Sequence, residues 1–183
     1  IADLSPLAGL TSLRTLYLGE NQISSVTPLT GLTSLETLYV NDNQVTDLTP
    51  LAPLTALTNL DLANNQISDI TALGSMTALQ ELVLSVNQIS DAGPLADLST
   101  LEHVNIDHDQ ITDVTPFASL SALDFLTLSA NPITDLGPLV SGPGPAAGAY
   151  LEIRDMPDLD CSAQAANIEA IEARGVSLSL NCQ

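Results

Sequence analysis

The sequence predicts an α/β solenoid, a chain wound into stacked coils with a parallel β-sheet along one side. Three observations support this prediction. The stretch of residues 35–51 recurs almost from end to end at an offset of 22 residues, leucine alternates with other residues inside each copy, and an asparagine column follows. Leu-x-Leu alternation indicates a short, half-buried strand, whose neighbours must be the equivalent strands of adjacent copies.

Two aliphatic columns show that the repeat keeps its register. Stepping by 22 residues, one column runs from Leu16 to Leu126 and the other from Leu18 to Leu128. A period of roughly 20 to 29 residues with the pattern L-x-x-L-x-L-x-x-N is the signature of leucine-rich repeats. We therefore expect a leucine-rich repeat horseshoe with a parallel concave β-sheet, short 3₁₀ or α turns on the convex side, and a C-terminal helix-strand cap.

The asparagine column is interpreted as structural. An Asn side chain offers a donor and an acceptor, and it can satisfy buried backbone groups that would otherwise cost roughly 1 to 3 kcal/mol each. An ionised carboxylate cannot donate, so at Asp109 we expect a raised pKa, a water molecule or a shifted turn. The column comprises Asn21, Asn43, Asn65, Asn87, Asp109 and Asn131.

The return segments predict one helical turn in each coil. Each begins with Ser, Thr or Gly, followed in most copies by Pro, so we expect the first residue to cap the turn and Pro to take the first helical position. These segments start at Ser5, Thr27, Thr49, Thr71, Gly93, Thr115 and Gly137.

The 22-residue unit, L-x-x-L-x-x-L-x-L-x-x-N-x-I-x-D-x-x-P-L, resembles the repeat of the internalin type of bacterial leucine-rich repeat protein over about residues 1–139. The resemblance implies a secreted or surface-exposed protein whose concave sheet binds a protein partner. It does not identify that partner.

The pattern divides the chain into a solenoid over residues 1–156 and a cap over residues 157–183. The chain starts inside a repeat, because Ile1 aligns with Ile23, so we expect a truncated first repeat whose end offers a surface for self-association. The Gly- and Pro-rich residues 141–148 predict a longer loop, with three extra residues before a seventh strand.

The cap is predicted as a helix over residues 162–174, capped by Ser162, and a strand over residues 176–180. Cys161 and Cys182 are the only two cysteines and bracket this cap, so we expect a disulfide and an oxidising compartment, extracellular or at the cell surface. A free or metal-bound pair is the alternative.

Composition excludes several classes of partner. Three Arg and no Lys against 22 acidic residues give a formal charge of −19, which disfavours nucleic acid and anionic lipid. No stretch approaches the ~20 apolar residues that span a membrane, so no membrane insertion is expected. The acidity fits a soluble surface in salt, a cation-binding surface or a basic partner.

Strand alternation places three positions of each repeat on the concave face, and exposed aromatic residues there are typical of interface hot spots. Thr127 and Ser129 are expected on this face. The alternative is that the aromatic rings only pack on one another. The predicted partner-binding residues are Tyr17, Tyr39, Asp61, Glu81, His103, Asn105, Asp107, Phe125 and Tyr150.

Two groups of residues contain candidate metal ligands. His103 and Asp107 lie about 13 Å apart along a strand, too far to share an ion, so with His108, Asp109 and Glu81 they predict a surface patch in which Glu81 pairs with His103. A second column favours Asx-turns over calcium binding between its carboxylates. Its members are Asp3, Asp47, Asp69, Asp91, Asp113 and Asp135.

These features favour a non-enzymatic recognition or adhesion module that binds a protein, or a glycan as the less favoured ligand. No catalytic motif is present, so catalytic residues, metal sites and cofactors are predicted as none, apart from the calcium alternative. The alternative function is a structural spacer or self-assembling extracellular scaffold that calcium stabilises.

Overall fold

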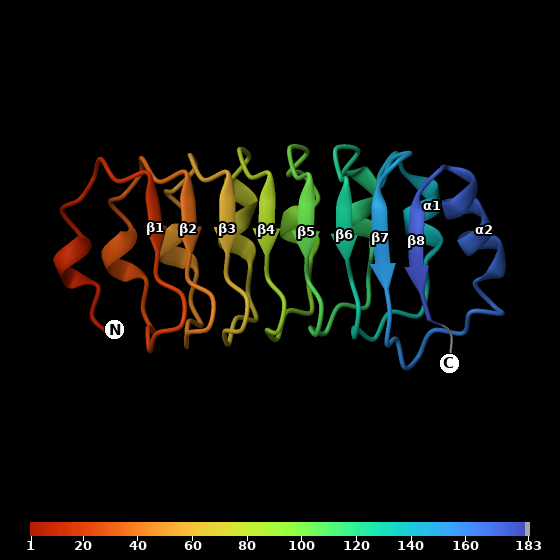
Figure 1. Cartoon of the computed structure of the whole chain (residues 1–183), viewed down its shortest axis with the longest axis horizontal. Helices are drawn as coiled ribbons and strands as arrows, with labels where there is room; N and C mark the ends of the chain where they lie inside the picture. The colour runs from red at the N-terminus through yellow and green to blue at the C-terminus, as the bar shows by residue number, and fades with distance from the viewer. Residues whose placement is uncertain (182–183) are drawn as a thin grey trace.

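The computed structural model describes residues 1–181 and shows one continuous stack of coils (Figure 1). Over this range a single parallel sheet runs in chain order from β1 to β8. Its strands are β1 Thr15–Tyr17, β2 Thr37–Tyr39, β3 Asn59–Asp61, β4 Glu81–Val83, β5 His103–Asn105, β6 Phe125–Thr127, β7 Tyr150–Ile153 and β8 Ser177–Leu180.

The strand register follows the repeat. Leu16 pairs with Leu38, 22 residues on, and this step is kept as far as β6. Leu126 then pairs with Leu151, which confirms the three extra residues predicted before the seventh strand. The leucine-rich repeat fold is therefore the one that the period predicts.

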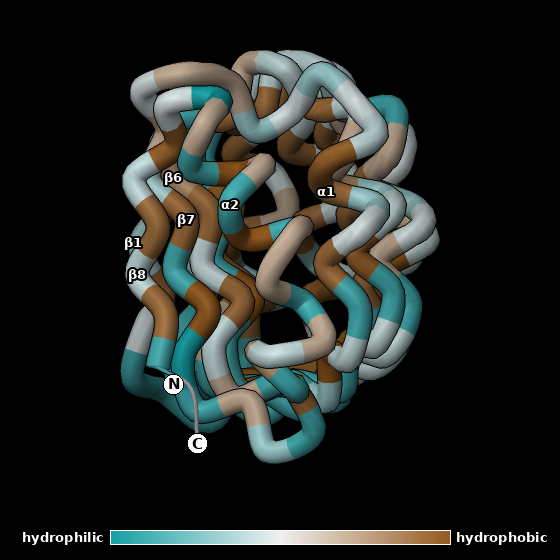
Figure 2. Tube along the Cα trace, turned by 90° about the vertical axis from the view of Figure 1, so that its right-hand side faces the viewer, coloured by the Kyte–Doolittle hydropathy of each residue, from teal (hydrophilic) through white to brown (hydrophobic). Residues whose placement is uncertain are grey.

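Short helices return the chain behind the sheet (Figure 1). They are η1 Ser5–Leu7, η2 Thr27–Leu29, η3 Thr49–Leu51, η4 Thr71–Ser75, η5 Gly93–Leu95, η6 Thr115–Ser119 and α1 Gly137–Ser141, the first six being 3₁₀ turns. Figure 2, along the solenoid axis, shows the sheet on one side and these helices on the other, with hydrophobic residues, coloured brown, on both.

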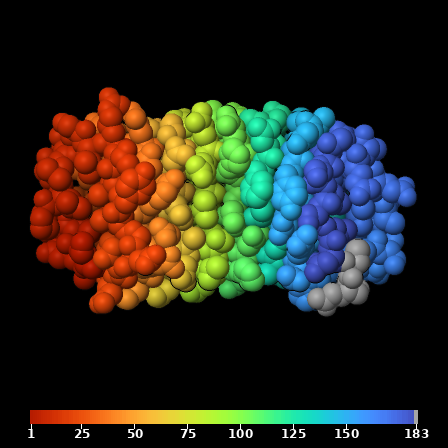
Figure 3. Space-filling model, in the orientation of Figure 1, coloured from red at the N-terminus to blue at the C-terminus, as the bar shows by residue number. Residues whose placement is uncertain are grey.

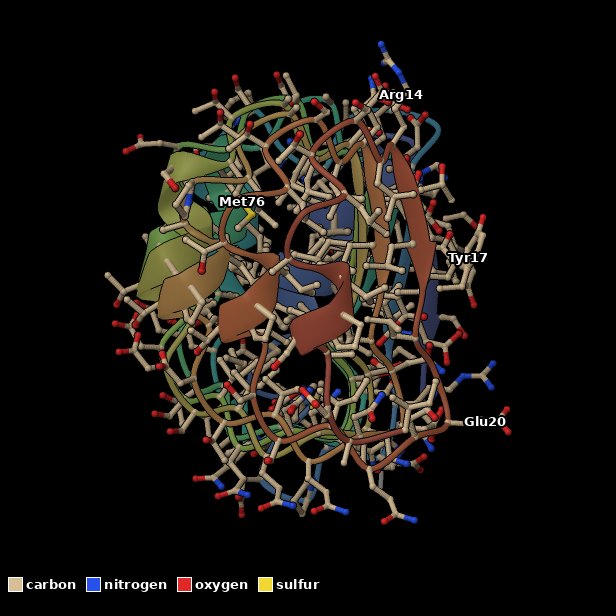
Figure 4. All side chains as sticks on the ribbon, turned by 90° about the vertical axis from the view of Figure 1, so that its left-hand side faces the viewer. Arg14, Tyr17, Glu20 and Met76 are labelled. Carbon is tan, nitrogen blue, oxygen red and sulfur yellow. The ribbon has the colours of Figure 1, made fainter. Side chains whose placement is uncertain are left out.

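The core is made of the repeated aliphatic positions. Leu38, Leu60 and Leu82, on neighbouring strands, are almost completely buried. Met76, at the end of η4, also lies in the interior between helices and sheet (Figure 4). Burial of one such side chain stabilises the fold by roughly 1.5 to 3 kcal/mol, so each coil depends on stacking against its neighbours.

The residues predicted to cap the short helices do not do so. Thr49 is the first helical residue of η3, and the position before it is the buried Leu48, which makes no capping bond. The Asp47 carboxylate instead accepts the Thr49 N–H at 2.8 Å, as in an Asx-turn. The same bond recurs at Asp3, Asp69, Asp91, Asp113 and Asp135.

The asparagine column links successive coils. Asn43 Oδ1 accepts the Ile23 N–H at 2.8 Å, while Nδ2 donates to carbonyls of Leu18 and Val40 at 2.9 and 3.0 Å. One side chain therefore satisfies backbone groups in its own coil and in the preceding one. Asn65 and Asn131 repeat the pattern and are buried.

The described part of the predicted cap, residues 157–181, forms α2 (Ala165–Ala173) and β8, and β8 extends the sheet by pairing with β7. The helix begins later than predicted, and Ser162 does not cap it. The Asp160 carboxylate accepts the N–H groups of Ser162 and Ala163, which keeps these residues in a preceding turn. Cys182, the predicted disulfide partner of Cys161, lies outside the described residues.

Arg174 joins the end of α2 to the preceding loop. Its guanidinium donates to the carbonyls of Leu139 and Pro145 at 2.6 and 3.0 Å. Close contact also explains Gly142 and Gly144, because a Cβ on these residues would lie 2.1 Å from the Ala118 carbonyl oxygen and 2.4 Å from that of Leu120, respectively. Within residues 1–181, no helix has the length and apolar character needed to cross a membrane.

Candidate functional site

The outward side of the eight strands, called the sheet face below, faces the viewer in Figures 1 and 3. Two side-chain columns run across it in register. The first contains Thr15, Thr37, Asn59, Glu81, His103, Phe125 and Tyr150, and the second contains Tyr17, Tyr39, Asp61, Val83, Asn105, Thr127 and Glu152. Eight of the nine predicted partner-binding residues are in these columns, and the ninth, Asp107, lies two residues after the end of β5.

The first aromatic cluster lies at the N-terminal end of the sheet face. Tyr17 and Tyr39 pair in register and meet edge to face, with ring centroids 5.0 Å apart. Tyr17 projects from β1 into solvent and is 66% exposed (Figure 4). Burial and the nearby Glu81 carboxylate raise the pKa of Tyr39, so its hydroxyl stays protonated and able to donate.

The second aromatic cluster spans β5 to β7. Phe125 stacks on Tyr150 with centroids 5.2 Å apart, and its centroid lies 6.2 Å from that of His103. The Tyr150 hydroxyl donates to the Glu152 carboxylate at 2.6 Å, which fixes the ring. Three neighbouring strands thus present one ordered row of rings.

Carboxylates lie between the aromatic clusters. Burial raises the pKa values of Asp61 and Asp107, and the Ala63 and Ser129 N–H groups, which donate to them at 3.0 and 2.6 Å, oppose those shifts. The predicted pairing of Glu81 with His103 is wrong. Glu81 accepts a bond from the Asn59 amide at 2.6 Å, and within residues 1–181 the ion pair present is Arg14–Glu36.

Two residues expected on the exposed face are buried. Thr127 and Ser129 are 4% and 7% exposed. The Ser129 backbone N–H is held by Asp107 and its hydroxyl accepts the Arg154 N–H, so neighbouring strands cover this position. Strand alternation predicted the side to which these residues point, but the packing of their neighbours decides their exposure.

The Asp residues of the second acidic column bind the backbone two residues further on. Hydrogen bonds from the hydroxyl and N–H of Thr49 lower the pKa of Asp47, an Asx-turn arrangement that needs no cation. His108 lies in a left-handed turn at the rim, away from the strand that holds His103. Among the residues that the structure describes, no group of three or more His, Cys, Asp or Glu is placed to hold a metal ion.

A shallow hollow of about 270 Å³ lies over β4 and β5. It is lined by the side chains of Glu81, Val83, His103, Asn105 and Phe125, and its floor is the Leu82 and Val104 segment. Val83 and Asn59 also lie on the sheet face, although neither is among the predicted partner-binding residues. The 22-residue register could have identified both, because Val83 is aligned with Asp61 and Asn105, and Asn59 with Glu81.

Comparison with known proteins agrees with this architecture. A family model that describes two copies of the leucine-rich repeat matches residues 33–75 and, a second time, residues 77–119. A crystal structure of internalin C2 from Listeria monocytogenes matches with a TM-score of 0.85 and 32% identity, covering 99% of this chain and 76% of that chain. The chain belongs to the internalin family of leucine-rich repeat proteins.

Other solved structures extend the comparison. A second Listeria monocytogenes internalin, InlF, matches at 30% identity with a TM-score of 0.85, and this internalin-type chain spans 52% of its length. A leucine-rich repeat protein of Leptospira interrogans shares the fold at 20% identity, with a TM-score of 0.77 over 97% of this chain and 51% of that chain. A search of curated proteins finds no match.

Proposed function

We propose that this internalin-type protein is a non-enzymatic recognition module that binds a protein partner through the sheet face. The observation behind the proposal is the placement of its aromatic residues. The chain has three Tyr and two Phe, and all of them except the buried Phe117 lie on this one face. Aromatic residues in ordered positions are the side chains that dominate the binding energy of protein interfaces.

The aromatic rings contact one another but remain partly exposed, so they are still available to a partner. Phe125 remains 37% exposed although it stacks on Tyr150, and Tyr17 stays exposed beside Tyr39. A side chain already held by its neighbours loses little conformational entropy when a partner covers it. The rings therefore offer preorganised apolar area at both ends of the face.

We further propose that the protein acts outside the bacterial cell or on its surface. The two cysteines and the internalin family support this location. The pairing of Cys161 with Cys182 and the division into solenoid 1–156 and cap 157–183 are retained as proposals. Mass spectrometry of the non-reduced, protease-digested protein tests the disulfide directly.

Affinity capture from host or environmental extracts tests the binding face. The bait is the whole chain, compared with the double variant Tyr39→Ala/Phe125→Ala and with a control, Asp97→Ala/Glu169→Ala, which changes two exposed residues outside the strands. We expect the same partner with wild type and control, and its loss with the sheet-face variant. Equal capture by all three proteins would refute the placement.

A further inference from the structure

The hollow over β4 and β5 has the size and lining of a receptor for one side chain. Small-molecule pockets occupy roughly 300 to 1,000 Å³, and this hollow, at about 270 Å³, lies below that range. Val83 and Phe125 supply apolar walls, while Glu81 and Asn105 supply polar groups at the margin. A long side chain with an apolar stem and a polar end matches this lining.

The charge at the margin is negative and has no cationic partner. Glu81 Oε2 accepts a single bond from the Asn59 amide, and the ion pair within residues 1–181 involves other residues. Asp61 lies on the adjacent strand β3, in the neighbouring side-chain column. Burial is the main cause of its raised pKa, and the carboxylates of Asp42 and Glu81 add smaller contributions. These carboxylates repel one another, so a cation placed between them would relieve that repulsion.

Negative charge continues along the same face. Asp107 and Glu152 lie on the far side of the hollow, and the chain as a whole carries a formal charge of −19. The one Arg on this face, Arg154, is bonded through Nε to Ser179 at the C-terminal edge. A partner segment that crosses the strands would therefore meet acidic groups at several points.

The geometry of the rings determines where a cation is held. Phe125 turns one face toward Tyr150, at an interplanar angle of 19°, and lies beside His103 on its other side. A cation prefers the face of a ring, which carries negative charge, and avoids its edge. Phe125 therefore offers its exposed edge to an aliphatic stem, and the charged end is directed to Glu81.

We propose that the hollow between β4 and β5 receives a lysine or arginine side chain from an extended basic segment of the protein partner. The proposal rests on the proposed function and adds the chemistry of the partner. The aliphatic stem packs on Val83 and Phe125, the cation meets Glu81, and further basic residues of the segment face Asp61, Asp107 and Glu152.

Titration of the ¹⁵N-labelled whole chain with defined peptides tests this proposal. The probe is the blocked peptide Gly-Arg-Gly-Arg-Gly, and the control peptide carries Gln in place of Arg. The Glu81→Gln variant keeps an acceptor for Asn59 and removes the charge, while Glu169→Gln removes the same charge from an exposed position on α2. The spectra also report whether each variant is folded.

We expect the Arg peptide to shift the amide resonances of Val83, His103 and Asn105, and the Gln peptide to shift none of them. Glu81→Gln should weaken the binding of the Arg peptide about fivefold, and Glu169→Gln should leave it unchanged. Raising the salt concentration should weaken binding further, because screening acts over about 10 Å at 0.1 M ionic strength.

Shifts spread over the Asp residues of the turns, or an equal response of both variants, would overturn the inference. So would the absence of shifts on the sheet face. These outcomes are distinct from failure of the proposed function, because a neutral partner that depends on Tyr39 and Phe125 would still be captured from extracts. Equal capture by wild type and the Tyr39→Ala/Phe125→Ala variant would refute the proposed function instead.

Discussion

Asp109 Oδ1 accepts the Ile89 N–H at 2.7 Å, which is the bond that each Asn of the column makes to the preceding coil. At the equivalent position Asn131 also donates through Nδ2 to the carbonyls of Ile106 and Leu128. In Asp109 the corresponding atom is Oδ2, which carries no N–H group and has no hydrogen-bond partner. Burial raises the pKa of Asp109 to about 7, so below that pH the protonated form, which can donate, predominates in the folded chain.

Asp109→Asn should therefore stabilise the protein. In the variant, an amide NH₂ group, which donates, takes the place of Oδ2. An unsatisfied buried polar atom costs roughly 1 to 3 kcal/mol. We expect an increase of about that size in the free energy of unfolding at pH 8, measured by urea denaturation. A variant no more stable than wild type would contradict the hydrogen-bond assignment.

The same residue predicts a pH dependence. Because its pKa is raised on folding from 3.8 to about 7, the stability contributed by Asp109 is fully present below about pH 4 and is lost as the pH rises through 7. The difference in stability between Asp109→Asn and wild type should therefore grow between pH 4 and pH 8. A constant difference across that window would show that Asp109 does not titrate as proposed.

Removal of one carboxamide from the column should be costly. Asn65→Ala leaves the buried Val45 N–H without a partner. The carbonyls of Val40 and Leu62 each lose one donor but keep a second, from Asn43 and Asn87 respectively. We expect a loss of about 1 to 3 kcal/mol in the free energy of unfolding, the cost of one unsatisfied buried donor. Gln66→Ala, at the exposed neighbouring position, is the control and should change stability by no more than about 0.5 kcal/mol.

Val86 has a left-handed backbone conformation, which favours Gly or Asn. Its φ is 62°, although β-branched residues are strongly disfavoured in the left-handed region, and its side chain is 47% exposed. Asn64 holds the same position in the preceding coil. Val86→Asn should stabilise the protein by about 1 kcal/mol in thermal unfolding, while Val83→Asn, within β4, should give no gain.

Gly142 is required by close packing. A Cβ at this position would lie 2.1 Å from the Ala118 carbonyl oxygen, so Gly142→Ala must displace the loop or η6. We expect a loss of about 1 to 3 kcal/mol. Gly9→Ala is a matched control, because a Cβ there has no heavy atom within 4 Å, and an equal loss at both positions would refute the packing explanation.

Period and alternation were sufficient to predict the fold, the strand register and the side of the sheet on which each residue lies. Tyr17 and Tyr39 were assigned to one face by the step of 22 residues, and Tyr150 by strand alternation once Leu151 was aligned with Leu126. The three extra residues before Tyr150 were also found from the alignment of Leu151 with Leu126.

What the pattern missed depends on side-chain contacts between coils. At the start of η3, the Asp47 carboxylate accepts the Thr49 N–H, and the Thr49 side chain does not cap the helix. Glu81 bonds Asn59 on one neighbouring strand and not His103 on the other, although both are in register with it. Such choices between equally close partners are made by local geometry, which a repeat pattern does not contain.

The central claim, that the sheet face contacts the partner, is tested most directly by site-specific photocrosslinking. A benzophenone side chain is introduced at Val83 in the middle of the face, or at Glu169 on α2, and each protein is irradiated in the extract that yields the partner. We predict a crosslinked product from Val83 and none from Glu169. Crosslinking from Glu169 alone, or equally from both positions, would contradict the account.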